Sequence, residues 1–235
     1  MRYMCALLLA AGAALAASKP APENPETLLQ KIRSRTAANL AQLPNYTCHE
    51  VMNRFLRRGG TWNQLDRVKI EVGFIGNEEL FARPGEDHFT ERVIDRVIQH
   101  GTVGNGAFGT HIEIIIMGNL ADFKYAGTGK KDRHQTFRYD FSVPLERSHF
   151  LIKHSSTQGL VPYEGSVWID AVTLDLVQVD LHVKHIAPYI GVRWIEEVIH
   201  YEVMHIANTE VLLPRKSELA ATDDAGNYSL NLVEL

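Results

Sequence analysis

The stretch from residue 165 to residue 185, GSVWIDAVTLDLVQVDLHVKH, most strongly constrains the fold. It reads as two strands joined by a turn at residues 170–173, with Trp168 near the end of the first strand. A period of two predicts an antiparallel sheet that is apolar on one side and exposed to water on the other. In the second strand one face carries Val177, Val179, Leu181 and Val183, and the other carries Gln178, Asp180, His182 and Lys184.

The same alternation recurs along the chain. Residues 66–75 place Val68, Ile70 and Val72 on one face, and residues 136–143 do the same with Phe137, Tyr139 and Phe141. Turn signals between such segments predict about ten or eleven strands joined as hairpins. A sheet of that size has to curl, because the twist accumulates from strand to strand. The predicted strands are residues 46–57, 66–75, 79–82, 121–126, 136–143, 149–154, 161–169, 174–185, 192–207, 210–220 and 227–233.

One helix is predicted near the N-terminus. Asn24-Pro25-Glu26 combines a capping side chain, a proline in the first turn and an acid at the positive end of the helix dipole. Pro44 ends the segment. Because the helix has one apolar stripe, we expect it to pack on the apolar face of the sheet. The stripe consists of Leu28, Leu29, Ile32, Thr36, Leu40 and Leu43.

Residues 88–119 form an insertion that breaks the strand pattern. Residues 89–99 have apolar side chains at helical spacing, and Thr110 and Glu113 have the spacing of a capping box. The β-branched run at residues 114–116 favours a strand instead; we interpret the segment as a short helix. Between the two lies a glycine-rich loop that could serve as a lid, with Gly101, Gly104, Gly106 and Gly109. The predicted fold is therefore mainly β (α+β): a single curled antiparallel sheet, or half-barrel, with both helical segments on its apolar face.

Residues 1–17 have the pattern of a cleaved signal peptide. Arg2 precedes an apolar run over residues 6–15, and Ala14-Leu15-Ala16 has the small-x-small form of a cleavage site. The run is too short for a stable transmembrane anchor, although an uncleaved leader could act as one. We expect export across the inner membrane to the periplasm, and a single domain over residues 18–235.

The mature chain would keep one cysteine, Cys48, so its fold cannot depend on an intramolecular disulfide. We interpret Cys48 as a half-buried strand residue. The formal net charge is −4, without a basic block. Nucleic acid and anionic lipid headgroups are therefore unfavourable partners for charge-driven binding.

No catalytic, cofactor or metal site is predicted. Residues 104–109 match G-x-G-x-x-G, but this fingerprint binds a dinucleotide only between a strand and a helix of a parallel unit. The chain has 11 histidines, yet none has the H-x-x-x-H spacing of a helical zinc site. It also lacks a G-x-S-x-G turn, and Asp223-Asp224 lies in a polar turn. We interpret Trp168 as a core residue, with ligand stacking as the alternative.

The order of elements resembles the LolA/LolB-like superfamily of periplasmic half-barrels, which includes outer-membrane lipoprotein-sorting carriers. The resemblance covers residues 25–235 and rests on the N-terminal helix that runs into a strand, on Arg83-Pro84-Gly85, and on the hairpin Trp168-Ile169-Asp170-x-x-Thr173. It implies a half-barrel covered by helices, whose concave apolar face holds acyl chains without catalysis. The segment 89–119 is longer than this pattern expects.

Three classes of function follow as expectations. The first is a non-catalytic carrier or binding protein for lipid or lipoprotein acyl chains, with a partly open apolar groove. The second is a non-catalytic interaction or envelope-sensor module on the same scaffold, with an envelope protein as partner. The third is a secreted hydrolase. The residues expected to line the groove are Val68, Ile70, Val72, Phe137, Tyr139, Phe141, Trp168, Val177, Val179 and Leu181.

Overall fold

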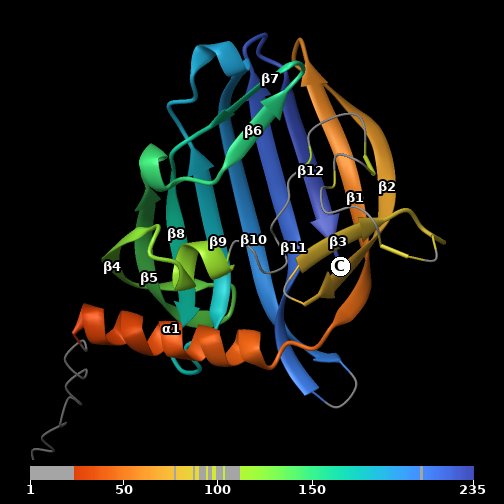
Figure 1. The fold of residues 1–235 in the computed structure, drawn as a ribbon. Helices are drawn as coiled ribbons and strands as arrows, with labels where there is room; N and C mark the ends of the chain where they lie inside the picture. Colours follow the sequence, from red (N-terminus) through yellow and green to blue (C-terminus); the bar gives the residue numbers. More distant parts are fainter. Residues whose placement is uncertain are drawn as a thin grey trace, which may run out of the picture.

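A computed structural model of the chain describes residues 24–76, 78–86, 88–89, 94, 97–98, 103, 112–206 and 209–235. Ten strands form one antiparallel sheet in the order β3-β2-β1-β12-β11-β10-β9-β8-β5-β4 (Figure 1). The strands are β1 (Tyr46–Arg58), β2 (Thr61–Ile75), β3 (Glu78–Ala82), β4 (Asp122–Lys131), β5 (His134–Val143), β6 (Leu151–His154), β7 (Thr157–Leu160), β8 (Tyr163–Asp170), β9 (Leu176–Val183), β10 (Val192–Ile206), β11 (Thr209–Asp223) and β12 (Tyr228–Glu234).

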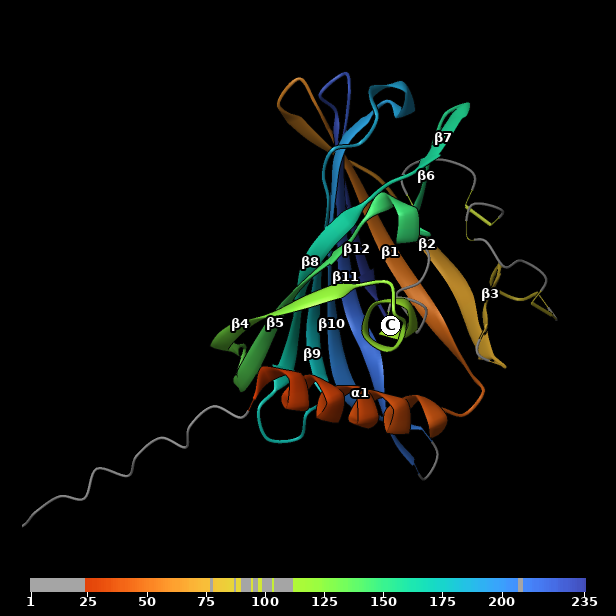
Figure 2. The ribbon, with the colours of Figure 1, turned by 60° about the vertical axis from the view of Figure 1, so that its left-hand side comes forward.

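The sheet curls into an open half-barrel, which confirms the predicted fold class. β3 and β4 are its two edges, and β12 pairs with β1, so the last strand lies beside the first. β6 and β7 form a separate hairpin that lies in front of the main sheet, over its concave face (Figures 1 and 2). β7 was not predicted, because its sequence TQGL does not alternate apolar and polar side chains.

The predicted N-terminal helix is α1 (Pro25–Ala41), which lies across one end of the sheet (Figure 1). The Asn24 side chain accepts a hydrogen bond of 2.9 Å from the backbone N–H of Glu26, as a capping residue does. The stripe predicted from the sequence faces the sheet. Its buried members within α1 are Leu28, Leu29, Ile32 and Thr36.

Only parts of the insertion are described. Glu113–Met117 form a π-helical turn, so the helical interpretation of this run is confirmed and the strand alternative is wrong. Ile94 and Ile98 are buried. The four glycines of the predicted lid loop and the predicted signal peptide lie outside the described residues, and those predictions remain untested. Within the described part of the chain, no helix has the length and apolar character needed to cross a membrane.

The β8–β9 hairpin has the predicted turn at residues 170–173, and it is packed on both faces. Gly165 leaves no room for a side chain, because an added Cβ would stand 2.0 Å from the Asp180 carbonyl oxygen and 2.8 Å from the Phe141 ring. The polar face of this hairpin was predicted to be exposed to water. Instead, Gln178 and Ser166 are buried there, because they lie in a network of side chains around Trp168.

Candidate ligand-binding site

The concave face of the sheet is apolar over β5, β8, β9 and β10. Strand register aligns Tyr139, Val167, Val179 and Ile199 in one row across the four strands. A neighbouring row holds Phe141, Gly165 and Leu181. Most of the residues predicted from β5 and β9 therefore do come together on this face. We call it the main apolar face; it contains Tyr139, Phe141, Val143, Val167, Ile169, Leu176, Val179, Leu181, Val183, Ile195 and Ile199, with Phe137 packed against it.

The three residues predicted from β2 lie in a separate apolar cluster. Ile70 and Val72 are buried, Val68 is partly buried, and they pack with Met52, Phe81, Ile94 and Ile98. The sequence pattern placed both sets on one side of the sheet, but it did not show that a sheet of this width divides its core. The predicted groove residues therefore form two groups.

Val177 is buried, but it is not part of either group. The pairing of β8 with β9 shifts between Trp168 and Ile169, so Leu176 lies opposite Ile169. Because of this shift Leu176, and not Val177, packs with the main apolar face. A register shift of this kind cannot be read from simple alternation.

Trp168 points away from the main apolar face, because it alternates with Val167 and Ile169 on β8. Its indole N–H donates to the Asp180 carboxylate at 2.7 Å. Lys131 Nζ lies 4.4 Å and Arg138 Cζ 5.2 Å from its ring centroid. Trp168 thus joins a network of charged side chains on the convex side, and it does not line the concave face as the sequence analysis expected.

The main apolar face is covered by segments outside the large sheet. α1 contributes Leu28, Leu29 and Ile32; the residues around the π-helical turn contribute Ile112, Ile115 and Ile116; and the β6–β7 region contributes Ile152 and Val161. The covered wall is closed to solvent: Tyr139 is 2%, Val179 1% and Leu181 0% exposed. The sequence predicted a partly open groove covered by α1 and the glycine-rich loop. Over this part of the face, α1, the π-helical turn and the β6–β7 region together cover the wall, so it is not open.

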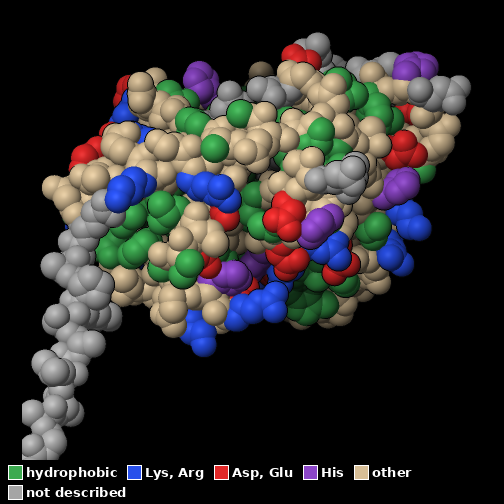
Figure 3. Space-filling model, turned by 90° about the horizontal axis from the view of Figure 1, so that it is seen from below, with side chains coloured by type: hydrophobic (Ala, Val, Ile, Leu, Met, Phe, Trp, Pro, Cys, Tyr) green, Lys and Arg blue, Asp and Glu red, His purple; other side chains and the backbone are tan. Residues whose placement is uncertain are grey.

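A small seam remains between α1 and the sheet. It holds a cavity of about 10 Å³, enough for one water-sized group. Apolar and small polar side chains surround it. They are Thr36, Asn39, Leu40, Leu43, Ile112, Leu176 and Leu212. Seen from below (Figure 3), the surface at this end of the molecule shows apolar patches between charged side chains.

Polar contacts join α1 to β5, to the π-helical turn and to the residue before β9. Tyr139 donates its hydroxyl hydrogen to the Pro25 carbonyl oxygen at 2.7 Å, and Arg33 donates to the Ile116 carbonyl oxygen at 3.1 Å. Arg35 and Asn39 both donate to the Asp175 carboxylate, at 2.7 and 2.8 Å. Burial alone would raise the pKa of Asp175, but these hydrogen bonds hold it below its ordinary value. Apolar side chains of α1, Leu28, Leu29 and Ile32, add to this attachment.

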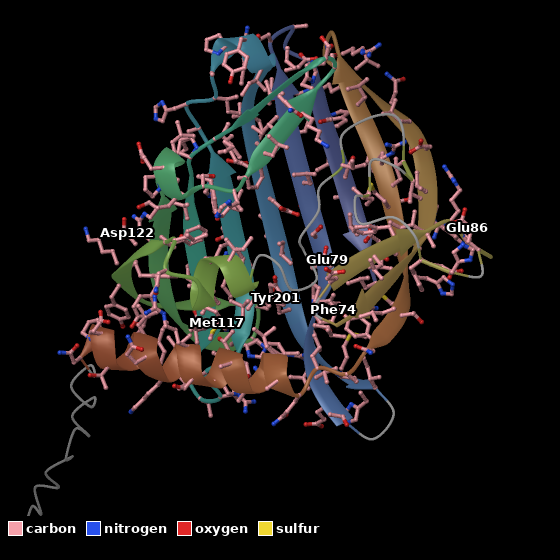
Figure 4. The ribbon with its side chains drawn as sticks, in the orientation of Figure 1. Phe74, Glu79, Glu86, Met117, Asp122 and Tyr201 are labelled. Atoms are coloured by element: carbon pink, nitrogen blue, oxygen red, sulfur yellow. The ribbon has the colours of Figure 1, made fainter. Side chains whose placement is uncertain are left out.

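A buried polar cluster, which the sequence analysis missed, lies where the apolar clusters meet. It consists of the inward-facing side chains Tyr46 and Glu50 of β1, Glu79 of β3, and Glu197 and Tyr201 of β10, all of which are buried. Figure 4 shows Glu79 and Tyr201 near each other on the inner side of the sheet. Alternation could have revealed Glu50, because it occupies the same face of β1 as Tyr46 and Met52.

The members of this polar cluster influence one another electrostatically. Burial first, and then the negative charges of Glu79 and Glu197, raise the pKa of Glu50 to about 8. Burial, with Cys48 and Glu79 nearby, raises the pKa of Tyr46. Burial, with Glu197, Glu79 and Tyr46 nearby, raises that of Tyr201. Glu50 is therefore mostly protonated at neutral pH.

Within the described ranges, the other candidates from the sequence do not assemble into a reactive site. Cys48 is half buried, as predicted, and burial raises the pKa of its thiol to about 12, which disfavours the reactive thiolate. His134 is close to Asp170 at 2.6 Å, and His182 to Glu196 at 3.3 Å. Among the described residues, no group of three or more His, Cys, Asp or Glu side chains is arranged to hold a metal ion.

Comparison with known proteins finds likeness at the level of structure. No family model matches the chain, and no curated protein matches it. A solved LolA superfamily protein from Nitrosomonas europaea has 10% identity, with 88% of this chain and 91% of that chain covered, at a TM-score of 0.41.

Two further solved structures show a similar degree of likeness. A domain named for outer membrane lipoprotein sorting, from Vibrio parahaemolyticus, has 11% identity, covers 87% of this chain and 91% of its own, and has a TM-score of 0.40. A DUF1329 family protein from Desulfovibrio piger has 9% identity, covers 88% and 91%, and has a TM-score of 0.39. At these TM-scores we draw no functional conclusion from the likeness.

Proposed function

We propose that this protein is a non-catalytic carrier or binding protein for the acyl chain of a lipid or lipoprotein. The observation that supports this proposal is the construction of the cover over the main apolar face. The strands of the sheet pair with one another and not with α1, and the cover contacts the sheet mainly through aliphatic side chains. Leu28, Leu29 and Ile32 of α1 thus occupy the place that a hydrocarbon chain would take.

Displacement of the cover by a ligand is energetically reasonable. Burial of hydrocarbon contributes about 0.8 kcal/mol per CH₂ group, so a chain of about 12 carbons offers apolar contact comparable to that of several Leu or Ile side chains. The strand ladder would stay intact, because α1 is not part of it. Entry would occur at the seam, where Leu40 and Leu212 are only partly buried.

A fluorescent fatty acid tests this proposal. Delipidated protein should enhance the fluorescence of cis-parinaric acid, and palmitate should displace the probe. Leu40→Gln places an amide in the seam, and we expect it to weaken probe binding by roughly 10-fold through lost apolar contact. Leu65→Gln is the matched control, because Leu65 is exposed on β2. Failure of the wild-type protein to bind the probe would refute the carrier function.

The second candidate function is a non-catalytic interaction or envelope-sensor module. One observation favours it: the main apolar face is filled by the protein's own side chains, so the scaffold can be stable without a ligand. A protein that copurifies without lipid and ignores the fatty acid would fit this function. An envelope protein partner would then bind an outer surface.

We also propose that the protein is exported to the periplasm and that residues 1–17 are removed. The supporting observation is the combination of Arg2, the apolar run at residues 6–15 and Ala14-Leu15-Ala16. We expect N-terminal sequencing of the periplasmic fraction to find a chain that begins near residue 17 or 18. An intact Met1 on periplasmic protein would exclude the cleavage.

A further inference from the structure

The first part of β2 is an open edge of the large sheet. β2 runs from Thr61 to Ile75, but β3 pairs only with residues 71–75. Within the described part of the chain, residues 61–70 pair with β1 alone, at the border of the sheet (Figure 1). A strand edge of this kind presents a row of backbone N–H and C=O groups, to which the strand of another chain can pair.

This open edge carries exposed apolar side chains. Residues 61–67 are all exposed, and among them Trp62 is 45% and Leu65 48% exposed. Native proteins usually protect an open edge with charged residues, prolines or bulges. β2 has a bulge at residue 65, where its pairing with β1 shifts, but the residue at the bulge is itself a leucine. Large apolar side chains at such an edge indicate a surface that binds a partner.

Next to this edge, an arginine lies between aromatic rings. Arg57 of β1 pairs with Trp62 on one side and with Tyr228 on the other. Its Cζ atom is 5.4 Å from the ring centroid of Trp62 and 5.1 Å from that of Tyr228. The Tyr228 ring also contacts the ring of Trp194, at a centroid separation of 5.7 Å. Because the rings restrict the guanidinium group, its N–H donors are preorganised to bind a carboxylate.

Two further cations lie on the same face of the sheet. Arg67 pairs with Asn53, and Lys69 pairs with Val51. Asn53 and Val51 alternate with Arg57 along β1, so the three positive side chains share the outer face. All three are exposed, and none forms an ion pair with a described residue. This charge is complementary to an acidic partner, whereas it would repel the same edge of a second copy.

We propose that the open edge of β2 is a docking site for an extended, acidic segment of a partner protein. The segment adds to β2 as a further strand through backbone hydrogen bonds. Its acidic side chains bind Arg57, Arg67 and Lys69, and its apolar side chains contact Trp62 and Leu65. Only a peptide can continue the strand ladder, so the edge favours a protein over a polysaccharide or a membrane surface. The site is separate from the main apolar face and does not depend on the carrier function.

Synthetic peptides of about nine residues test this docking site. In the acidic peptide glutamate alternates with valine, and in the basic peptide lysine replaces every glutamate. Fluorescence anisotropy of the labelled peptides, titrated with the full chain, should show that the acidic peptide binds at least about 10-fold more tightly. A third peptide has the acidic sequence with every backbone nitrogen methylated. We expect it not to bind, because it cannot donate hydrogen bonds to the edge of β2.

Reversal of the charges on β2 should reverse the choice of peptide. We expect the double variant Arg67→Glu and Lys69→Glu to bind the acidic peptide about 10-fold more weakly and to prefer the basic peptide. Both side chains are exposed, so urea unfolding should show an unchanged midpoint. The matched control is Lys124→Glu with Lys130→Glu, which makes the same change at exposed positions of β4, the opposite edge of the sheet. It should retain the preference for the acidic peptide, and loss of binding in this control would move the site to β4 and overturn the proposal.

One substitution separates the docking site from the proposed function. Leu65→Gln should weaken binding of the acidic peptide by about 3-fold through lost apolar contact, while cis-parinaric acid binds as it does to wild type. Peptide binding without fatty-acid binding would support the docking site and refute only the carrier function.

Three results would overturn the docking site and leave the carrier function intact. The first is equal affinity for the acidic and basic peptides, or no binding of either. The second is undiminished binding of the methylated peptide, which would show charge attraction without strand addition. The third is a wild-type dimer in light scattering that becomes a monomer in Leu65→Lys, which would assign the edge to a second copy.

Discussion

Val179→Asp should not give a stable folded protein. Val179 is 1% exposed and lies between Val167 and Ile199 in the row that crosses β8, β9 and β10. The described neighbours offer aliphatic carbon, so a carboxylate there would be buried without a partner. Such a group costs several kcal/mol, a large fraction of the roughly 5–15 kcal/mol that stabilises a domain. Circular dichroism during urea titration would measure the loss.

Val203→Asp is the control for this substitution. Val203 lies on β10 of the same sheet, but it is 51% exposed, so the same chemical change should alter the free energy of unfolding by less than about 1 kcal/mol. If Val179→Asp unfolds cooperatively at nearly the same urea concentration as Val203→Asp, water reaches the wall of the main apolar face. That result would restore the open groove that the sequence pattern predicted.

The fold could be predicted from the sequence because the alternation of side chains is a local property. Each residue of β5 or β9 takes its face from its neighbours in the chain, so Tyr139 and Val179 were placed on the apolar face before any tertiary contact was known. The same parity would have placed Trp168 opposite Val167 and Ile169. Its assignment to the groove followed from the hydrophobicity of tryptophan rather than from its position.

The state of the concave face could not be predicted, because it depends on segments distant in the sequence. Whether Leu181 faces a ligand or a helix depends on where Ile32 and Ile115 lie, and the periodicity of the sequence does not reveal the positions of these distant residues.

The buried polar cluster could be predicted in part. Glu50 interrupts an apolar row on β1 and could have been noticed, whereas its approach to Glu197, on a strand that does not pair with β1, follows only from the curl of the sheet.

Glu50→Gln should stabilise the ligand-free protein at neutral pH. The pKa of Glu50 is raised to about 8 in the folded state by burial and by Glu79 and Glu197, against about 4 in an unfolded chain. Between these values the folded protein binds a proton that the unfolded chain does not, so its stability falls as pH rises, by about 1.4 kcal/mol per pH unit. At pH 7, about three pH units above the unfolded pKa, the accumulated cost is about 4 kcal/mol. Glutamine keeps the shape of the protonated acid and removes this cost.

The pH dependence shows whether the protonation of Glu50 causes the change in stability. The difference in unfolding free energy between Glu50→Gln and wild type should be small at pH 5, grow steadily to pH 8 and then level off. Groups with a depressed pKa, such as Asp175, make the folded state less stable as the pH falls, and they do so only at acidic pH. Because wild type and Glu50→Gln share these groups, their contributions cancel in the difference. A difference that stays constant between pH 5 and pH 8 would show that Glu50 does not change its protonation on folding.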